Sequence, residues 1–201
     1  MRTEFDPVTH EGKVDGTVWP SVSQILKEFG LIKLDGIQPD VLEAKRKLGV
    51  RVHAATVLLD SGELDEEHFN STFPECIPYL EGYRKFRIIE KLNVLHKEER
   101  LFSAKWKFHG CPDEVAVREL DGRNVIVDYK TCWKVYPATV CQLEAYRILV
   151  EECRGIKVSG VYSLMLKPNG TYDFKEYKEP GAKMDFLHAL SLHWRKRSFY
   201  K

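Results

Sequence analysis

Residues 110–130 read GCPDEVAVRELDGRNVIVDYK, and this stretch indicates the fold most directly. From Asp113 to Leu120 apolar and polar residues alternate, which is the two-residue period of a β-strand. Asp121-Gly122 is a dipeptide typical of tight hairpin turns. A second strand-like run follows at residues 124–130. We therefore predict an antiparallel β-hairpin over this stretch.

The predicted hairpin gathers residues that suit phosphate chemistry. Side chains alternate along a strand, so Asp128 and Lys130 should share one face while Tyr129 points away. The Tyr129 carbonyl lies between them, and Asp113 enters on the neighbouring strand. Two carboxylates and a carbonyl can converge on a hard cation such as Mg²⁺, which prefers oxygen ligands. An ammonium group beside the metal ion could orient a water molecule and offset charge on a phosphate.

Helices and strands are predicted on both sides of the hairpin, whereas the first twenty residues are rich in turn signals. Ser21 and Gln24 have the spacing of a helix capping box. The predicted helices run from Ser21 to a stop at Gly30, from Pro39 to Gly62 with an apolar stripe, from about Pro74 to Asn93, from Pro137 to Glu152, and from Ala182 to Arg195. The further predicted strands are 101–103, 107–108, 158–166 and 172–177.

This order predicts a mixed α/β fold in which a central mixed β-sheet is flanked by helices, with a helical N-terminal region. The 201 residues suit a single domain over 1–201. Within it we expect a helical part over about 20–95, a catalytic core over about 96–178 and a C-terminal helix over about 182–201.

Composition limits the classes of function. The formal net charge is +1, which argues against a histone-like or an acidic tail, but a nucleic-acid groove needs only local positive charge. The five cysteines are widely spaced without a C-x-x-C pair, as is typical of reduced thiols. There is no apolar run of membrane-spanning length and no signal-peptide pattern. We therefore expect a soluble, cytoplasmic protein.

Three other positions are candidate site residues, and each has a plainer alternative. Gln142 and Tyr146 are four residues apart and share a helix face, although a core tyrosine beside a surface glutamine would look the same. His53 lies one helical turn after Gly49 and could instead be a packed histidine. Glu98 precedes a predicted strand and is a candidate acidic site residue. Its neighbour Glu99 could take the same role, and the simpler interpretation is that Glu98 is an exposed acid outside the site.

Taken together, these motifs resemble the PD-(D/E)XK nuclease superfamily. Pro112-Asp113 and Asp128-x-Lys130 correspond to the two halves of its signature and flank the predicted hairpin. Gly110-x-x-Asp113 and Gln142-x-x-x-Tyr146 look like motifs of its RecB-type branch, and Gly49-x-x-x-His53 resembles the metal-binding histidine segment of that branch. The segment from Trp19 to Leu26 looks like the start of phage and mitochondrial genome maintenance exonucleases. The likeness extends from Trp19 to about Leu166.

The resemblance implies a restriction-endonuclease-like core and a metal-dependent DNA exonuclease that acts on single- or double-stranded ends, for example in DNA repair or recombination. It implies one or two Mg²⁺ or Mn²⁺ ions, a catalytic Lys130, and supporting roles for Gln142 and Tyr146. The implied metal ligands are His53, Asp113, Asp128, the Tyr129 carbonyl and, as an extra or outer ligand, Glu98.

Two alternatives and one expected absence accompany this interpretation. A structure-selective endonuclease is the alternative within the class, and RNA is an alternative substrate. A non-catalytic DNA-binding subunit on a nuclease fold is less favoured, because neither the expected ligands nor the lysine has been lost. Related CRISPR-associated exonucleases hold an iron–sulfur cluster with three cysteines after the core. Here only Cys153 follows Tyr146, so no iron–sulfur cluster is expected.

Overall fold

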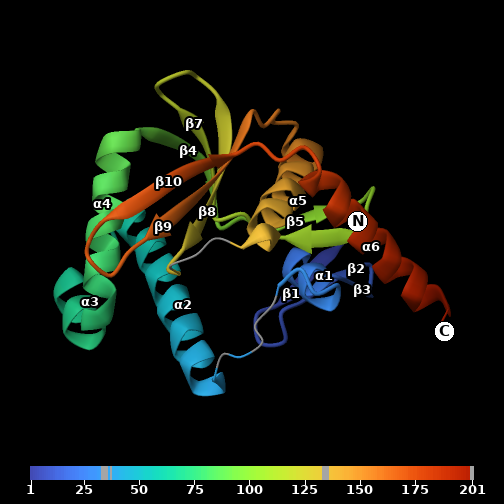
Figure 1. Cartoon of the computed structure of the whole chain (residues 1–201), viewed down its shortest axis with the longest axis horizontal. Coiled ribbons are helices and arrows are strands. Elements are labelled where there is room, and N and C mark those ends of the chain that lie inside the picture. Colours follow the sequence, from blue (N-terminus) through green and yellow to red (C-terminus); the bar gives the residue numbers. More distant parts are fainter. Residues whose placement is uncertain (33–35, 37, 133–135, 200–201) are drawn as a thin grey trace.

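The computed structural model describes residues 1–32, 36, 38–132 and 136–199. Its centre is a five-stranded mixed sheet in the order β10-β9-β8-β7-β4 (Figure 1). The strands are β4 (Leu92–Lys97), β7 (Glu114–Arg118), β8 (Asn124–Lys130), β9 (Gly160–Leu166) and β10 (Tyr172–Tyr177). Strands β8 and β9 are parallel and the other pairs are antiparallel. The predicted α/β class with a central mixed sheet is therefore confirmed.

The hairpin of residues 110–130 forms as β7 and β8, with Glu114 opposite Val127. Gly122 adopts a φ of 67°, which its lack of a side chain permits in the turn. Strand β8 is buried over nearly all its length because sheet neighbours lie on both sides and helices cover both faces. The C-terminal end of β8 therefore carries Asp128 and Lys130 into the interior.

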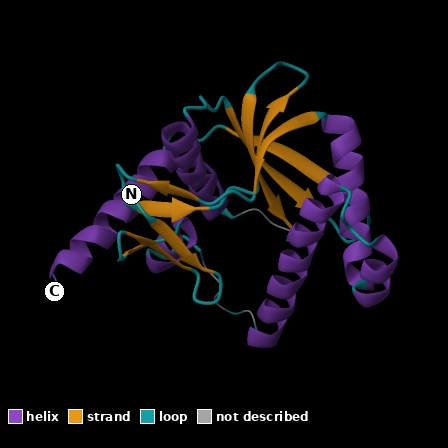
Figure 2. Cartoon of the chain, turned by 180° about the vertical axis from the view of Figure 1, so that it is seen from behind, coloured by secondary structure: helices purple, strands orange, loops and turns teal. Residues whose placement is uncertain are grey.

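Helices cover both faces of the sheet (Figures 1 and 2). On one face lies a core formed with α1 (Val22–Glu28), α5 (Pro137–Arg154) and α6 (Ala182–Phe199), to which the sheet contributes residues such as Val115 and Ile126. On the other face lie α2 (Pro39–Ser61) and α4 (Ile77–Glu90), which pack on Val127 and Tyr129. Helix α5 joins the parallel strands β8 and β9, a connection that requires a crossover. None of the helices in the described part of the chain is long and apolar enough to cross a membrane.

Several local predictions are correct. Ser21 caps α1 in a complete capping box with Gln24. Helix α2 begins at Pro39 and ends before Gly62, which is left-handed as expected for a helix stop. The apolar stripe of α2 is only half buried, since Val52 is inaccessible whereas Val41 is 41% exposed. In Figure 1 the first turns of α2 extend away from the sheet, which explains the difference.

The expected helix from Pro74 to Asn93 is wrong at both ends. A short 3₁₀ helix (Pro74–Cys76) precedes α4, which ends at Glu90, and Asn93 belongs to β4. Lys91 takes a left-handed conformation, φ 47°, and turns the chain into the edge of the sheet beside β7. The helix α3 (Glu66–Thr72), which Asp65 caps, was not expected from the sequence.

The first twenty residues are more ordered than their turn signals indicated. They form an antiparallel sheet of β1 (Thr3–Asp6), β2 (Glu11–Val14) and β3 (Thr17–Trp19). The predicted strands near 101–108 are β5 (Leu101–Ser103) and β6 (Phe108–Gly110), which pair with each other in a separate two-stranded sheet. An isolated parallel bridge between Ser21, which follows β3, and His109 of β6 connects the N-terminal sheet to this two-stranded sheet.

Candidate active site

The C-terminal end of β8 places its alternate side chains on opposite faces of the sheet. Asp128 and Lys130 lie together, with 2.6 Å between Asp128 Oδ2 and Lys130 Nζ. Tyr129 points the other way into the core beside α2 and α4. Asp128 is only 1% exposed, so its charge is compensated by the lysine and not by solvent.

Asp113 immediately precedes β7 and is held by the backbone of β8. Its Oδ2 accepts a hydrogen bond from the Tyr129 N–H at 2.5 Å. The Asp113 carbonyl accepts a further bond from the Glu98 N–H at 3.0 Å. These two bonds leave Asp113 Oδ1 directed at His53, with 3.6 Å between Oδ1 and the imidazole Nδ1.

His53, Glu98 and Asp113 form a group whose ligand atoms all lie within 4.8 Å of one another. Glu98 Oε1 is 3.5 Å from His53 Nδ1, and His53 Nε2 donates to the Tyr129 carbonyl at 3.1 Å. One imidazole and two carboxylates suit Mn²⁺, and the carboxylates with a carbonyl suit Mg²⁺. The donor set therefore fits a divalent cation. Asp128 is not part of this group, because its carboxylate pairs with Lys130.

The structure distinguishes the two candidate glutamates by their partners. Glu99 forms ion pairs with Arg154 and with His96, the latter at 2.9 Å. Glu98 instead lies beside His53 and also accepts from the Cys111 thiol at 3.7 Å. Glu98 has a left-handed backbone, φ 49°, in the turn between β4 and β5. Only Glu98 of this pair belongs to the metal-ligand group.

Gln142 and Tyr146 share a face of α5, and that face is turned toward Lys130. Lys130 Nζ donates to Gln142 Oε1 at 3.2 Å, and Gln142 Nε2 donates to the Tyr146 hydroxyl at 2.9 Å. The Tyr146 ring packs closely over Gly110. A Cβ added at Gly110 would lie 2.9 Å from Tyr146 Cε1 and 2.9 Å from Leu149 Cδ1. The glycine of the Gly110-x-x-Asp113 motif thus makes room for this tyrosine.

The buried charges shift one another's pKa values. Burial alone would lower the pKa of His53, but the carboxylates of Asp113 and Glu98 raise it to about 10. Burial would raise the pKa of Asp113, but His53 and Lys130 hold it below its usual range. Burial raises the pKa of Asp128 to about 6, although Lys130 opposes this shift. Without a metal ion His53 is therefore protonated at neutral pH, and it must lose a proton before Nδ1 can bind a cation.

A buried polar network behind the hairpin was not anticipated from the sequence. Glu114 is fully buried and accepts from the Tyr129 hydroxyl and from Arg87, the latter at 3.0 Å. Tyr83 and Lys97 continue the network toward α2, with 2.7 Å between the Lys97 Nζ and the Tyr83 hydroxyl. Alternation along β7 could have indicated it, because Glu114 faces away from Asp113 toward apolar neighbours. The network anchors the side chain of Tyr129, whose backbone atoms contact both Asp113 and His53.

Comparisons with known proteins identify structural likeness alone. No family model matches the sequence, and no curated protein matches it. Among solved structures, a protein from Eubacterium rectale described as a "putative exonuclease" is similar over 86% of this chain and 71% of its own, at 13% identity and a TM-score of 0.49. The structure of the protein SSO0001 is similar over 85% of this chain and 81% of its own, at 14% identity and a TM-score of 0.38. At these values the likeness carries no functional argument.

Proposed function

We propose that this chain is a divalent-metal-dependent deoxyribonuclease that hydrolyses phosphodiester bonds from DNA ends. The observation that carries the proposal is the close approach of His53, Glu98 and Asp113 beside the paired Asp128 and Lys130. Asp113, Asp128 and Lys130 belong to the hairpin region, whereas Glu98 and His53 come from the turn after β4 and from α2. The resemblance to PD-(D/E)XK nucleases supports treating these residues as one site.

In the proposed mechanism His53 Nδ1, Asp113 and Glu98 would hold Mg²⁺ or Mn²⁺. Asp128 would become a further ligand by exchanging its contact with Lys130 for the cation, and the Tyr129 carbonyl by giving up its bond to His53 Nε2. The cation would supply Lewis-acid stabilisation of the charge on the phosphate. Asp113 can accept from the Tyr129 N–H through one oxygen while the other faces the cation site. This backbone bond fixes the carboxylate before any ligand arrives, which reduces the ordering cost of binding.

Lys130 is the residue that we assign to the reacting phosphate and water. Its ammonium group is held on one side by Asp128 and on the other by the Gln142 side-chain carbonyl. The lysine therefore presents a fixed positive charge at the metal-ligand group, where it can orient the attacking water and offset developing charge. Gln142 and Tyr146 act as positioning residues, because they contact the lysine and each other.

The preference for ends rests on the resemblance of Gly110-x-x-Asp113 and Gln142-x-x-x-Tyr146 to RecB-type motifs. It is tested by incubating the full chain and end-labelled linear DNA with Mg²⁺ or Mn²⁺, beside covalently closed and nicked circles. We expect progressive loss of linear DNA, survival of closed circles, and no reaction with EDTA. Rapid cutting of closed circles would instead favour the structure-selective endonuclease.

Two further arms separate the remaining alternatives. Labelled RNA of the same sequence tests the choice of sugar, and faster cleavage of RNA would overturn the assignment to DNA. A DNA-binding measurement in Ca²⁺ accompanies the cleavage assay. Tight DNA binding without cleavage under any metal would identify a non-catalytic binding subunit.

A further inference from the structure

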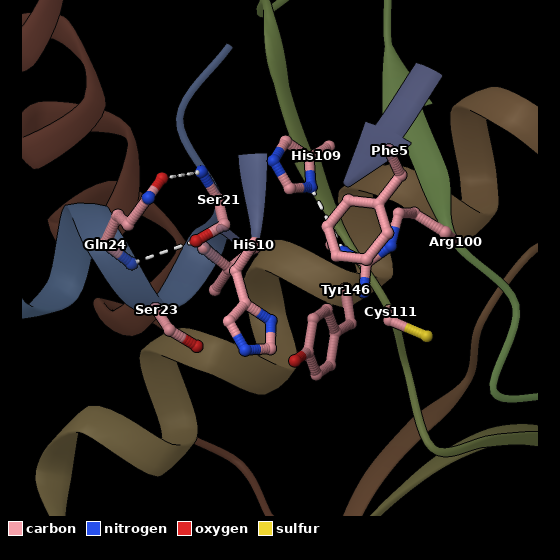
Figure 3. Close-up of a pocket in the computed structure, with 11 residues that line it drawn as sticks. Phe5, His10, Ser21, Ser23, Gln24, Arg100, His109, Cys111 and Tyr146 are labelled. Carbon is pink, nitrogen blue, oxygen red and sulfur yellow. Dashed lines mark hydrogen bonds between the residues drawn. The ribbon is translucent and has the colours of Figure 1, made fainter. Parts of the chain in front are cut away.

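A cavity adjoins the proposed active site, between the N-terminal sheet, the start of α1, the end of β6 and α5. It measures ≈280 Å³, close to the roughly 300 Å³ at which small-ligand pockets begin. Figure 3 shows Phe5, His10, Arg100, Cys111 and Tyr146 around it. Two of these residues also contact the proposed site: Tyr146 accepts from Gln142, and Cys111 donates to Glu98. The cavity therefore lies one side chain away from the metal-ligand group.

Arg100 brings a positive charge to this cavity. Its guanidinium lies 3.5 Å from the centre of the Phe5 ring, and its Nη1 is 3.2 Å from His109 Nδ1. Burial and the charge of Arg100 lower the pKa of His109 to about 4, so the imidazole is neutral and can accept this bond. In the described ranges Arg100 has no ion pair with a carboxylate, whereas Arg87 and Arg123 each pair with two carboxylates. A half-buried cation without a counter-ion favours binding of an anion from solution.

The wall that carries Phe5 is fixed in place. The imidazole of His109 is fully buried and stacks on Phe102, with 5.2 Å between the ring centres. Gly12 lies directly over that imidazole, and a Cβ there would be 2.5 Å from Nε2. The His109 N–H also donates to the Pro20 carbonyl at 3.0 Å. These contacts hold the N-terminal sheet against β6, so Phe5 is part of a rigid wall of the cavity.

The other groups around the cavity suit a nucleobase better than a bare anion. Phe5 and His10 present aromatic rings, and the ring centres are 6.3 Å apart. Successive bases of single-stranded nucleic acid stack on such rings while cations contact the backbone. Ser21 and Gln24 also line the cavity, but they are already engaged with each other in the capping box, as the dashed lines in Figure 3 show.

We propose that this cavity binds the terminal nucleotide of a single-stranded DNA end, with a phosphate on Arg100 and the base against Phe5 and His10. The neighbouring phosphodiester would then reach the metal-ligand group past Tyr146 and Cys111. This inference rests on the proposed function, because it requires DNA as the substrate. It also supplies a physical reason for end preference, since a cavity of this size accommodates one terminal unit.

The first test measures binding without cleavage. Oligonucleotides that carry 2-aminopurine at the 5′ or the 3′ terminal position are titrated with the full chain in Ca²⁺. Each is compared with an oligonucleotide whose terminal nucleotide is abasic. We expect the abasic change at one end to weaken binding roughly ten-fold, as stacking of a single base on an aromatic ring implies. Equal binding of normal and abasic ends at both termini would overturn the proposal.

The second test introduces Phe5→Leu, which keeps apolar bulk without a flat ring, and Arg100→Gln. Phe5→Leu should weaken binding of the normal end several-fold. In this variant, replacing the terminal base by an abasic site should cause almost no further loss of affinity, because the base and the Phe5 ring form one interaction. Arg100→Gln should weaken both ends alike. Phe199→Leu and Arg195→Gln are matched controls, since Phe199 is 74% exposed and Arg195 lies exposed on α6. Thermal melts establish that each variant is folded.

Cleavage in Mn²⁺ separates failure of this inference from failure of the proposed function. If wild-type protein degrades DNA but Phe5→Leu and Arg100→Gln behave like their controls, the cavity does not bind the terminal nucleotide and the nuclease proposal stands. If binding depends on the cavity but DNA is never cut, the cavity proposal stands and the nuclease proposal falls. Equal dependence for blunt duplex ends would contradict the single-strand assignment.

Discussion

The substitution Gly110→Ala tests whether close packing at Gly110 positions Lys130 through Tyr146 and Gln142. The added Cβ would lie 2.9 Å from both Tyr146 Cε1 and Leu149 Cδ1, and 3.0 Å from Val22 Cγ2. These atoms belong to side chains in the core around α1 and α5, so at least one of these packed side chains must shift to admit the methyl group. Overpacking of this kind costs about 1–3 kcal/mol. The gain from restricting the unfolded chain offsets about 0.4–1 kcal/mol of that.

We therefore expect Gly110→Ala to lower the free energy of unfolding by about 1–2 kcal/mol. In a protein of this size that corresponds to a fall in Tm of roughly 2–8 °C. The Tyr146 ring must shift away from Gly110, which disturbs its bond to Gln142 and thus the support of Lys130. Cleavage should fall about ten-fold, equivalent to about 1.4 kcal/mol of transition-state stabilisation. Metal affinity should stay unchanged, because the metal-ligand group does not include these residues.

Urea unfolding, calorimetric titration with Mn²⁺ and cleavage of linear DNA measure the three effects. Gly181→Ala is the matched control, since a methyl group there meets no atom within 4 Å. It should stay within about 0.5 kcal/mol of wild type. A Gly110→Ala protein with wild-type stability and activity would refute the packing argument. A loss of metal affinity equal to the loss of activity would show that Gly110 acts on the ligand group and not through Tyr146.

Three further predictions concern the charged groups. Lys130→Met should abolish cleavage while Mn²⁺ still binds, whereas Asp113→Asn should lose both cleavage and Mn²⁺ binding. Lys157→Met, at an exposed position, serves as the control. Cleavage by Lys130→Met at the wild-type rate would contradict the role of the lysine. His53→Ala should weaken metal binding, with a defect that shrinks at high Mn²⁺. An earlier melt with an unchanged metal titration would instead indicate a packed histidine. The pKa of His53 is raised to about 10 from an ordinary 6.5, so protonated His53 stabilises the metal-free fold. This contribution to the free energy of unfolding is complete below about pH 6.5 and is lost as the pH rises through 10. Urea unfolding of the metal-free protein should show that decline and His53→Ala should lack it, while metal affinity should rise with pH because the cation and the proton compete.

Much of the hairpin formed by β7 and β8 could be predicted because its signals are local. The turn dipeptide Asp121-Gly122 and the strand patterns on each side specify β7 and β8 within twenty-one residues of chain. Alternation alone put Asp128 and Lys130 on one face, and the structure pairs them at 2.6 Å. The caps of α1 and α2 are equally local, since each involves residues within one helical turn.

The predictions of secondary structure are wrong where a segment adopts its structure by packing or pairing with residues far away in the sequence. Leu92–Lys97 continues the apolar spacing of α4, and only pairing with β7 makes it a strand. The N-terminal strands have three or four residues each, and they are stabilised by packing on His109 from a different sheet. Short segments of this kind have no periodicity long enough to be recognised.

The sequence by itself determined which chemical groups are present and how they are spaced along each element. It could not distinguish Glu98 from Glu99, because that choice depends on Arg154 and His96 taking the second carboxylate. It also could not indicate that Arg100 lies beside Phe5 without an acidic partner among the described residues. Both outcomes depend on which surfaces the folded chain brings together. A charge acquires its partner, its burial and therefore its pKa only when segments far apart in the sequence pack against each other.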